Sequence, residues 1–258
     1  MNHYSPGRFQ ILPPVVKNLL IINVIFFVAT LVVQKLGIDL SDKLGLHFFG
    51  SEKFEPYQVI TYMFMHGGFG HVFFNMFALW MFGYAIENYM GPKRFLIYYL
   101  ATGIGAAMLH YGVFYLEIKP YLDPINRYLS NPENIDFQHQ LINALNPIVS
   151  QPISIQNLNY EVIETFKIDL LNQPVVVGAS GAVFGILLAF GMMFPNSVIY
   201  LYFAIPVKAK YFVIGYGLIE LWLGFSNRGD SNIAHFAHIG GMIFGFILLK
   251  YWKIKRLN

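Results

Sequence analysis

Three short runs place polar side chains inside otherwise apolar stretches of this sequence. They are His66-Gly-Gly-Phe-Gly-His71 with Asn75 after it, Gly178-Ala-Ser180-Gly181, and His235-Phe-Ala-His238. A serine hydroxyl becomes a strong nucleophile when a neutral imidazole takes its proton. Attack on a carbonyl also needs hydrogen-bond donors for the developing oxyanion. The three runs contain both kinds of group, so they predict serine-dependent hydrolysis.

The spacing within the first run indicates which of its side chains can act together. His71 and Asn75 are four residues apart, which places them on one face of a helix, and both can donate hydrogen bonds. His66 and His71 are five residues apart, or about 140° around a helix. We therefore expect these two histidines to face different directions.

The composition is that of a membrane protein. Of the 258 residues, 56% are hydrophobic and only 12% are charged, whereas a soluble domain has roughly 25% charged residues. This composition also excludes intrinsic disorder. The lack of cysteine excludes a disulfide scaffold, Cys-ligated zinc and thiol catalysis. The net charge of +3 is too small and too dispersed to indicate nucleic acid as a partner.

The apolar stretches indicate how the chain crosses the bilayer, since a spanning helix needs about 20 mostly apolar residues. We predict an all-α bundle of six helices, at residues 19–33 (extendable to 36), 59–86, 95–116, 174–194, 211–225 and 233–249. The apolar stretch 198–207 is too short to span and contains Pro206, so we interpret it as an interfacial loop. Residues 1–258 are therefore predicted to form a single membrane domain.

Basic residues predict the orientation of this bundle, because they concentrate in cytoplasmic loops. If the N-terminus lies inside, the cytoplasmic segments contain Arg8, Lys17, Lys93, Arg94, Lys208, Lys210, Lys250, Lys253, Lys255 and Arg256. Most acidic residues then lie outside, so we expect both termini in the cytoplasm.

A polar insertion at residues 117–173 separates the third and fourth predicted spans. Its five prolines predict short helices broken by turns, outside the membrane on the outer face: Pro120, Pro124, Pro132, Pro147 and Pro152.

Small residues indicate which spans touch. The helical rise places Ser180 about 9 Å into its span from Pro174, and His238 about 7.5 Å into the sixth span. Both predicted spans contain a G-x-x-x-G face that allows close packing, formed by Gly181 with Gly185 and by Gly241 with Gly245. Packing of these two faces would bring Ser180 and His238 together.

With these motifs in this order, the chain resembles the rhomboid intramembrane serine proteases over about residues 15–250, without the insertion. The resemblance rests on H-x4-H-x3-N at His66, His71 and Asn75, G-x-S-G at residues 178–181, and A-H-x-x-G at residues 237–241. It implies Ser180 as nucleophile, His238 as general base, no acidic third member, and no metal or other cofactor.

The same resemblance implies the remaining parts of the site. His71, Asn75 and the Ser180 backbone N–H correspond to the oxyanion hole, and Phe184 corresponds to an aromatic residue that supports the base. Gly178, Gly181, Gly241 and His66 are expected as supporting residues, with His66 in a structural role.

The implied function is hydrolysis of peptide bonds in or next to the transmembrane segment of single-span membrane proteins. The chain would lie in the lipid bilayer of a bacterial plasma membrane. One alternative is a non-catalytic rhomboid-like protein that binds client transmembrane helices, although such a protein would be expected to have lost the serine or the histidine.

A second alternative is a metal- or haem-binding protein that uses the several histidines. It is disfavoured because the second span lacks H-E-x-x-H and no aligned histidine pair on facing helices is apparent. Among the other polar residues, Glu87 is interpreted as a helix-end anchor. Glu220 has no obvious partner in the sequence and is interpreted only as a group with a buried hydrogen bond. No role is given to His235.

Overall fold

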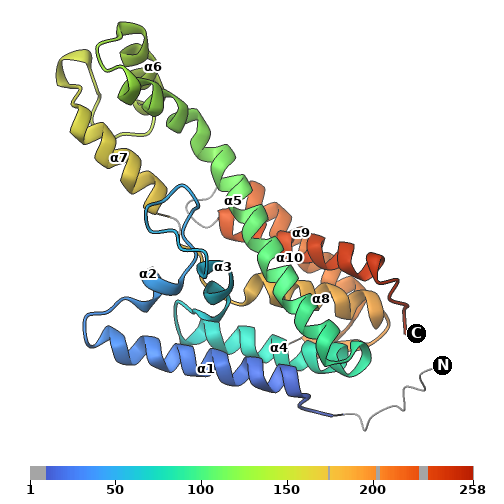
Figure 1. The fold of residues 1–258 in the computed structure, drawn as a ribbon. Coiled ribbons are helices and arrows are strands. Elements are labelled where there is room, and N and C mark those ends of the chain that lie inside the picture. The colour runs from blue at the N-terminus through green and yellow to red at the C-terminus, as the bar shows by residue number, and fades with distance from the viewer. Residues whose placement is uncertain (1–9, 174, 202–203, 227–231, 258) are drawn as a thin grey trace. The chain divides into compact units, whose positions relative to one another are not determined.

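The computed structural model describes residues 10–173, 175–201, 204–226 and 232–257 (Figure 1). They divide into two compact units. The first comprises Met1–Leu46, Pro56–His110 and Val176–Asn258, and the second comprises His47–Glu55 and Tyr111–Val175. Two residues used in the predictions lie outside the described residues. They are Arg8, which supports the predicted orientation, and Pro174, the predicted start of the fourth span.

Helices predominate among the described residues. The first unit contains α1 (Pro14–Gln34), α2 (Leu40–Leu44), α3 (Gln58–Thr61), η1 (Tyr62–Phe64), α4 (Phe69–Met90), α8 (Ser180–Met193), α9 (Ala209–Phe225) and α10 (Asn232–Tyr251). The helix α5 (Pro92–Ser130) begins in this unit and ends in the second, which also contains α6 (Ile135–Leu145), η2 (Ile155–Asn157) and α7 (Tyr160–Asn172). The predicted helical class is confirmed.

Four helices in the described residues are long and apolar enough to cross a membrane: α1, α4, α5 and residues 234–251 of α10. The helix α8 is apolar but has only 14 residues. Within the first unit, α1 packs against α4, and α10 packs against both α8 and α9 (Figure 1). These contacts bring together the segments that carry the polar runs.

The second predicted span begins later than expected. Residues 58–64 form α3 and η1, and α4 begins only at Phe69, after Gly67 and Gly68. Glycine is a poor helix former, so this pair separates the two segments. At the other end, Gly91 adopts a φ of 80° and Pro92 begins the next helix, as is usual for these two residue types.

The fourth predicted span also begins later, because α8 starts at Ser180 itself. Val176 forms an isolated antiparallel bridge with Leu46, so the chain before α8 is extended rather than helical. An extended residue covers about twice the distance of a helical one. The helical rise from which the depth of Ser180 was derived therefore does not apply to the chain before this residue.

The helix α5 continues through Pro120 and Pro124, where the sequence predicted turns. A proline inside a helix frees the carbonyl four residues before it. Leu116, which carries one such carbonyl, is 69% exposed. The predicted break at these two prolines is absent, and the helix runs on to Ser130.

Strands occupy residues 198–201 and 205–208, where the sequence predicted an interfacial loop without regular structure, so the fold is not purely α. Strand β1 (Val198–Leu201) pairs antiparallel with β2 (Ile205–Lys208), and Tyr200 lies opposite Pro206. The β-branched residues of the two strands, such as Ile199 and Val207, favour strand structure. Pro206 is tolerated because both strands of a two-stranded sheet are edge strands.

The second unit has its own small hydrophobic core, formed by Ile125, Tyr128, Leu141, Leu145 and Ile163. Asn134 and Asn159 cap α6 and α7 by accepting backbone N–H bonds. The predicted insertion thus contains short helices, as expected. Its location on the outer side of the membrane stays a prediction.

Candidate active site

The close packing of α8 and α10 depends on glycine. A Cβ atom added to Gly241 would overlap the carbonyl oxygen of Gly181, and one added to Gly245 would lie 3.4 Å from the Cα of Gly185. The Tyr98 hydroxyl donates to the Gly185 carbonyl at 2.8 Å and ties α5 to the same place. The predicted packing of the two G-x-x-x-G faces is confirmed.

Ser180 is the first residue of α8, at a backbone turn that requires glycine. Gly178 adopts a φ of 122°, and its N–H donates to the Tyr62 carbonyl at 2.9 Å. The first N–H groups of a helix have no partner within the helix, and that end carries a partial positive charge. Ser180 therefore lies at a helix end whose N–H groups have no partner within the helix and could bind an oxyanion.

His71 of α4 lies against this turn. A Cβ at Gly178 would be 2.7 Å from the Cε1 and Nε2 atoms of His71, so only glycine leaves room for the ring. The Gly67 N–H donates to Nδ1 of His71 at 3.4 Å. Since Nδ1 accepts, the ring proton is on Nε2, on the side that faces Gly178.

Asn75 is the second polar side chain of α4 at this position. It is 6% exposed, and its Nδ2 donates to the His71 carbonyl at 2.9 Å. An amide nitrogen carries two N–H bonds, so one donor is left for a ligand. His71 and Asn75 therefore provide two donors on one face of α4, as the spacing predicted.

His238 of α10 is held on two sides. Its ring stacks on Phe184 of α8 with a centroid distance of 4.1 Å and an interplanar angle of 5°. Its Nδ1 donates to Oε2 of Glu220 on α9 at 2.9 Å. Phe184 lies where the sequence placed an aromatic support for the base.

Glu220 and His235 are the two residues of this region that the sequence analysis missed. Nδ1 of His235 donates to the same Glu220 oxygen at 2.7 Å. The buried hydrogen bond suggested for Glu220 is therefore confirmed, and its partners are His235 and His238, which were not predicted. A carboxylate lies beside the base, although no acidic third member was expected. A signal was present, because His235 and His238 are three residues apart and so share a helix face, and Glu220 is a lone carboxylate in the preceding span.

The predicted reacting groups line one cavity. Its volume is 920 Å³, and Ser180, His238, His71 and Asn75 all contribute to its wall. Most of the other lining side chains are apolar and come from α4, α8, α9 and β1, including Phe74, Phe212, Tyr216 and Tyr200. The structure thus brings together four groups that are as many as 167 residues apart in the sequence.

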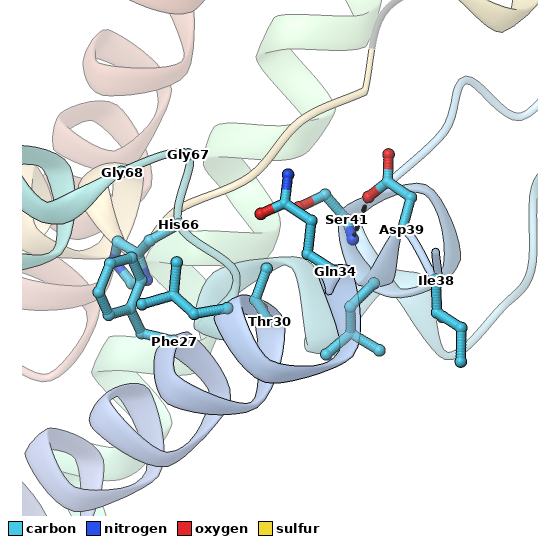
Figure 2. A pocket seen from close by; sticks show the side chains of 11 residues that line it. Phe27, Thr30, Gln34, Ile38, Asp39, Ser41, His66, Gly67 and Gly68 are labelled. Carbon is cyan, nitrogen blue, oxygen red and sulfur yellow. Dashed lines mark hydrogen bonds between the residues drawn. The ribbon is translucent and has the colours of Figure 1, made fainter. Parts of the chain in front are cut away.

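His66 does not lie on α4, so the prediction that it points away from His71 is wrong. It precedes the helix, and the centroids of the His66 and His71 rings are 5.0 Å apart. His66 also lines a second cavity of 130 Å³, together with Asp39 and Ser41, which lie across it from His66 and Phe27 (Figure 2). This cavity shares no lining residue with the larger one.

Glu87 has the anchoring contacts predicted for it. Its two carboxylate oxygens accept the backbone N–H groups of Val15 at 2.9 Å and of Val16 at 2.8 Å. These are donors at the start of α1 that have no partner within the helix. The carboxylate therefore ties the end of α4 to the start of α1.

Glu220, His235 and His238 form a cluster that could hold a metal ion. Ligand atoms of these three residues lie within 4.8 Å of one another, and no other such group occurs in the described part of the chain. Both histidines belong to α10 and the carboxylate to α9, so this group does not contradict the expectation that no histidine pair aligns across facing helices. The group has the ligand types that zinc accepts.

Comparison with known proteins identifies the family. The sequence model of the Rhomboid domain matches residues 53–117 and 156–253, so the chain belongs to the rhomboid family. The match leaves out residues 118–155, which lie within the predicted insertion.

Three relatives illustrate this membership. The chain is 30% identical over 186 residues to "RHOMBOID-like protein 12, mitochondrial" of Arabidopsis thaliana, covering 71% of this chain and 42% of that protein. It is 24% identical over 196 residues to "Putative rhomboid protease YdcA" of Bacillus subtilis, covering 75% of this chain and 66% of YdcA. It is 44% identical to "Rhomboid protease GluP" of the same bacterium over 50 residues, which is 19% of this chain and 10% of GluP. The chain thus spans less than two thirds of the length of these relatives.

Proposed function

We propose that the chain is an intramembrane serine protease that hydrolyses peptide bonds in or next to transmembrane segments of membrane proteins. Ser180 is the nucleophile and His238 the general base. The observation that carries this proposal is the shared cavity, in which Ser180 and His238 lie with two further hydrogen-bond donors, His71 and Asn75.

The geometry supports a two-step acyl transfer. Nε2 of His238 takes the proton as the Ser180 oxygen attacks the carbonyl carbon, and the protonated ring then gives this proton to the leaving amine. The oxyanion is bound by the Ser180 N–H and by the side chains of His71 and Asn75. Water attacks the resulting acyl-enzyme with His238 again as base, which releases the second product and restores Ser180.

The proposal also predicts the kind of substrate. Within a helix the carbonyl groups are occupied by backbone hydrogen bonds, so a substrate segment must unwind before Ser180 can reach it. The apolar lining of the cavity suits the side chains of such a segment. Single-span proteins whose helix contains Gly, Ala, Ser or Pro near the outer face are the expected class.

In the proposed topology, six helices span the bilayer with both termini in the cytoplasm and the insertion outside. The location expected from the sequence, a bacterial plasma membrane, is not favoured by the comparisons. They include a relative named as mitochondrial beside two from Bacillus subtilis. What they support is residence in a membrane.

A serine-directed fluorophosphonate probe separates the proposed protease from a non-catalytic client-binding relative. The probe should label the wild-type protein and Ser197→Ala, but not Ser180→Ala. The reason is that phosphonylation needs a serine activated by a base, which the proposal assigns to Ser180 alone. Equal labelling of all three proteins, or of none, would refute the proposal.

Replacement of Asn75 tests the oxyanion hole. Asn75→Ala should lower turnover about tenfold to 100-fold. This is less than the roughly 100- to 1,000-fold loss when one oxyanion-hole donor is removed from another hydrolase, because the His71 side chain and the Ser180 N–H remain here. The Michaelis constant should change little, since the bond strengthens only in the transition state.

The alternative role for Asn75 is structural, through its bond to the His71 carbonyl. In that case Asn75→Ala would lower the melting temperature while the folded fraction keeps normal turnover. Turnover and melting temperature measured on the same purified variant decide between the two roles.

A chelator tests the metal-dependent alternative. Cleavage should be unchanged after incubation with EDTA, because the proposed chemistry needs only side-chain and backbone groups. Loss of activity with recovery on adding zinc would instead make the cluster of Glu220, His235 and His238 a metal centre.

A further inference from the structure

A carboxylate on α9 is buried between two histidines of α10. Glu220 is 5% exposed, and its Oε2 atom accepts from Nδ1 of His235 at 2.7 Å and from Nδ1 of His238 at 2.9 Å. Both distances are typical of charge-assisted hydrogen bonds. We infer that Glu220 is a positioning residue that orients His238 and extends the serine–histidine pair to a Ser180–His238–Glu220 triad. This inference rests on the proposed function.

The bond to Glu220 decides which nitrogen of His238 can act as a base. A neutral imidazole carries one proton, so donation from Nδ1 leaves an unprotonated lone pair on Nε2. Nε2 is the opposite ring nitrogen, and His238 lines the cavity with Ser180. Glu220 therefore selects the tautomer that can take the proton of Ser180.

Glu220 and Phe184 restrict different motions of the same ring. Phe184 stacks on its face at 4.1 Å and prevents tilting, but stacking alone leaves the ring free to turn within its plane. The bond to Oε2 removes that freedom because it holds one edge of the ring. A base oriented by a third group is the arrangement that activates nucleophiles in other hydrolases.

The position of the carboxylate also matters after proton transfer. Once His238 has taken the proton, the ring carries a positive charge that a neighbouring carboxylate stabilises. A carboxylate within a membrane helix is costly unless it is paired. His235 supplies a second donor to the same oxygen, so it holds Glu220 in place while His238 changes its charge.

The distances favour hydrogen bonding over metal binding. Two ligand atoms bound at 2.0–2.1 Å to a tetrahedral zinc ion are about 3.3 Å apart. The separations between the Glu220 oxygen and the histidine nitrogens are 2.7 and 2.9 Å. At these distances a proton, not a metal ion, lies between each pair of atoms.

The kinetic test compares wild type with Glu220→Gln and Glu220→Asp in a cleavage assay. Glu220→Gln should lower kcat about 10- to 1,000-fold, because the amide can stabilise the wrong tautomer and carries no charge. KM should stay within about twofold, as for an interaction needed only in the transition state. Glu220→Asp keeps the charge, so its kcat should be at least about tenfold higher than that of Glu220→Gln.

A matched control is available in Glu87, a buried carboxylate whose partners among the described residues are two backbone N–H groups of α1. Glu87→Gln should lower the melting temperature and leave kcat of the folded protein unchanged. If Glu220→Gln behaves in the same way, with reduced stability and normal kcat, Glu220 is an anchor and the inference is wrong.

A measurement without catalysis covers the case in which Glu220→Gln does not fold. The measurement is an NMR spectrum of wild-type protein labelled with ¹⁵N-histidine. The signals of His238 are identified as those that disappear in the His238→Ala variant. In the neutral form of the ring they should show the proton on Nδ1. A neutral ring with its proton on Nε2 would contradict the inference. Absence of cleavage by wild type would refute only the proposed function, since this spectrum still tests the bond.

Discussion

His238→Ala should be as inactive as Ser180→Ala, with kcat lower than that of wild type by a factor on the order of 10⁴ to 10⁶. This is the range found when serine hydrolases lose their nucleophile or base. The reason is geometric, because His238 is the imidazole that lines the cavity with Ser180 and is held by both Phe184 and Glu220. The other cavity histidine, His71, accepts a hydrogen bond at Nδ1 and so presents a donor rather than a base.

His235→Ala is the control for this experiment. It removes a neighbouring histidine that also bonds Glu220 but does not line the cavity. Activity of His235→Ala should exceed that of His238→Ala by at least about 100-fold, since the base remains. If His238→Ala retains substantial turnover and His235→Ala does not, the base has been assigned to the wrong histidine.

Gly241→Ala should lower turnover about 100-fold, which is the effect of a displacement near 1 Å in a catalytic site. The added methyl group would overlap the Gly181 carbonyl one residue after Ser180, so α8 and α10 must move apart. Overpacking of this kind also costs about 1–3 kcal/mol of stability. We therefore expect a lower melting temperature as well, measured together with kcat.

Gly215→Ala is the matched control, because a Cβ at Gly215 on α9 meets no described atom within 4 Å. Alanine is a better helix former than glycine, so this variant should be as stable as wild type or slightly more stable, with normal turnover. Equal activity of Gly241→Ala and Gly215→Ala would show that the close contact of α8 and α10 does not position Ser180.

The sequence singled out four residues that the structure brings to one cavity, because membrane helices rarely contain polar groups without a purpose. Ser180, His238, His71 and Asn75 stood out against apolar neighbours, and the glycine spacing indicated which helices pack. The identity of the contacting helices therefore followed from local patterns.

The errors arose where a backbone conformation depends on distant contacts. The bridge between Leu46 and Val176 keeps the chain before Ser180 extended. No local sequence pattern predicts this pairing, because the two residues are far apart in the chain. The same limit explains Glu220, whose partners are 15 and 18 residues further along the chain. A pairing across two helices needs the angle between them, which spacing alone does not provide.

The most direct test of the account is a cleavage assay in proteoliposomes with purified protein and a single-span substrate. The substrate should contain Gly and Ala near the outer end of its transmembrane segment. Wild type should release two fragments whose new ends lie in or next to that segment, and Ser180→Ala should release none. Cleavage at the same bond by Ser180→Ala would contradict the assignment of Ser180 as the nucleophile on which the account depends.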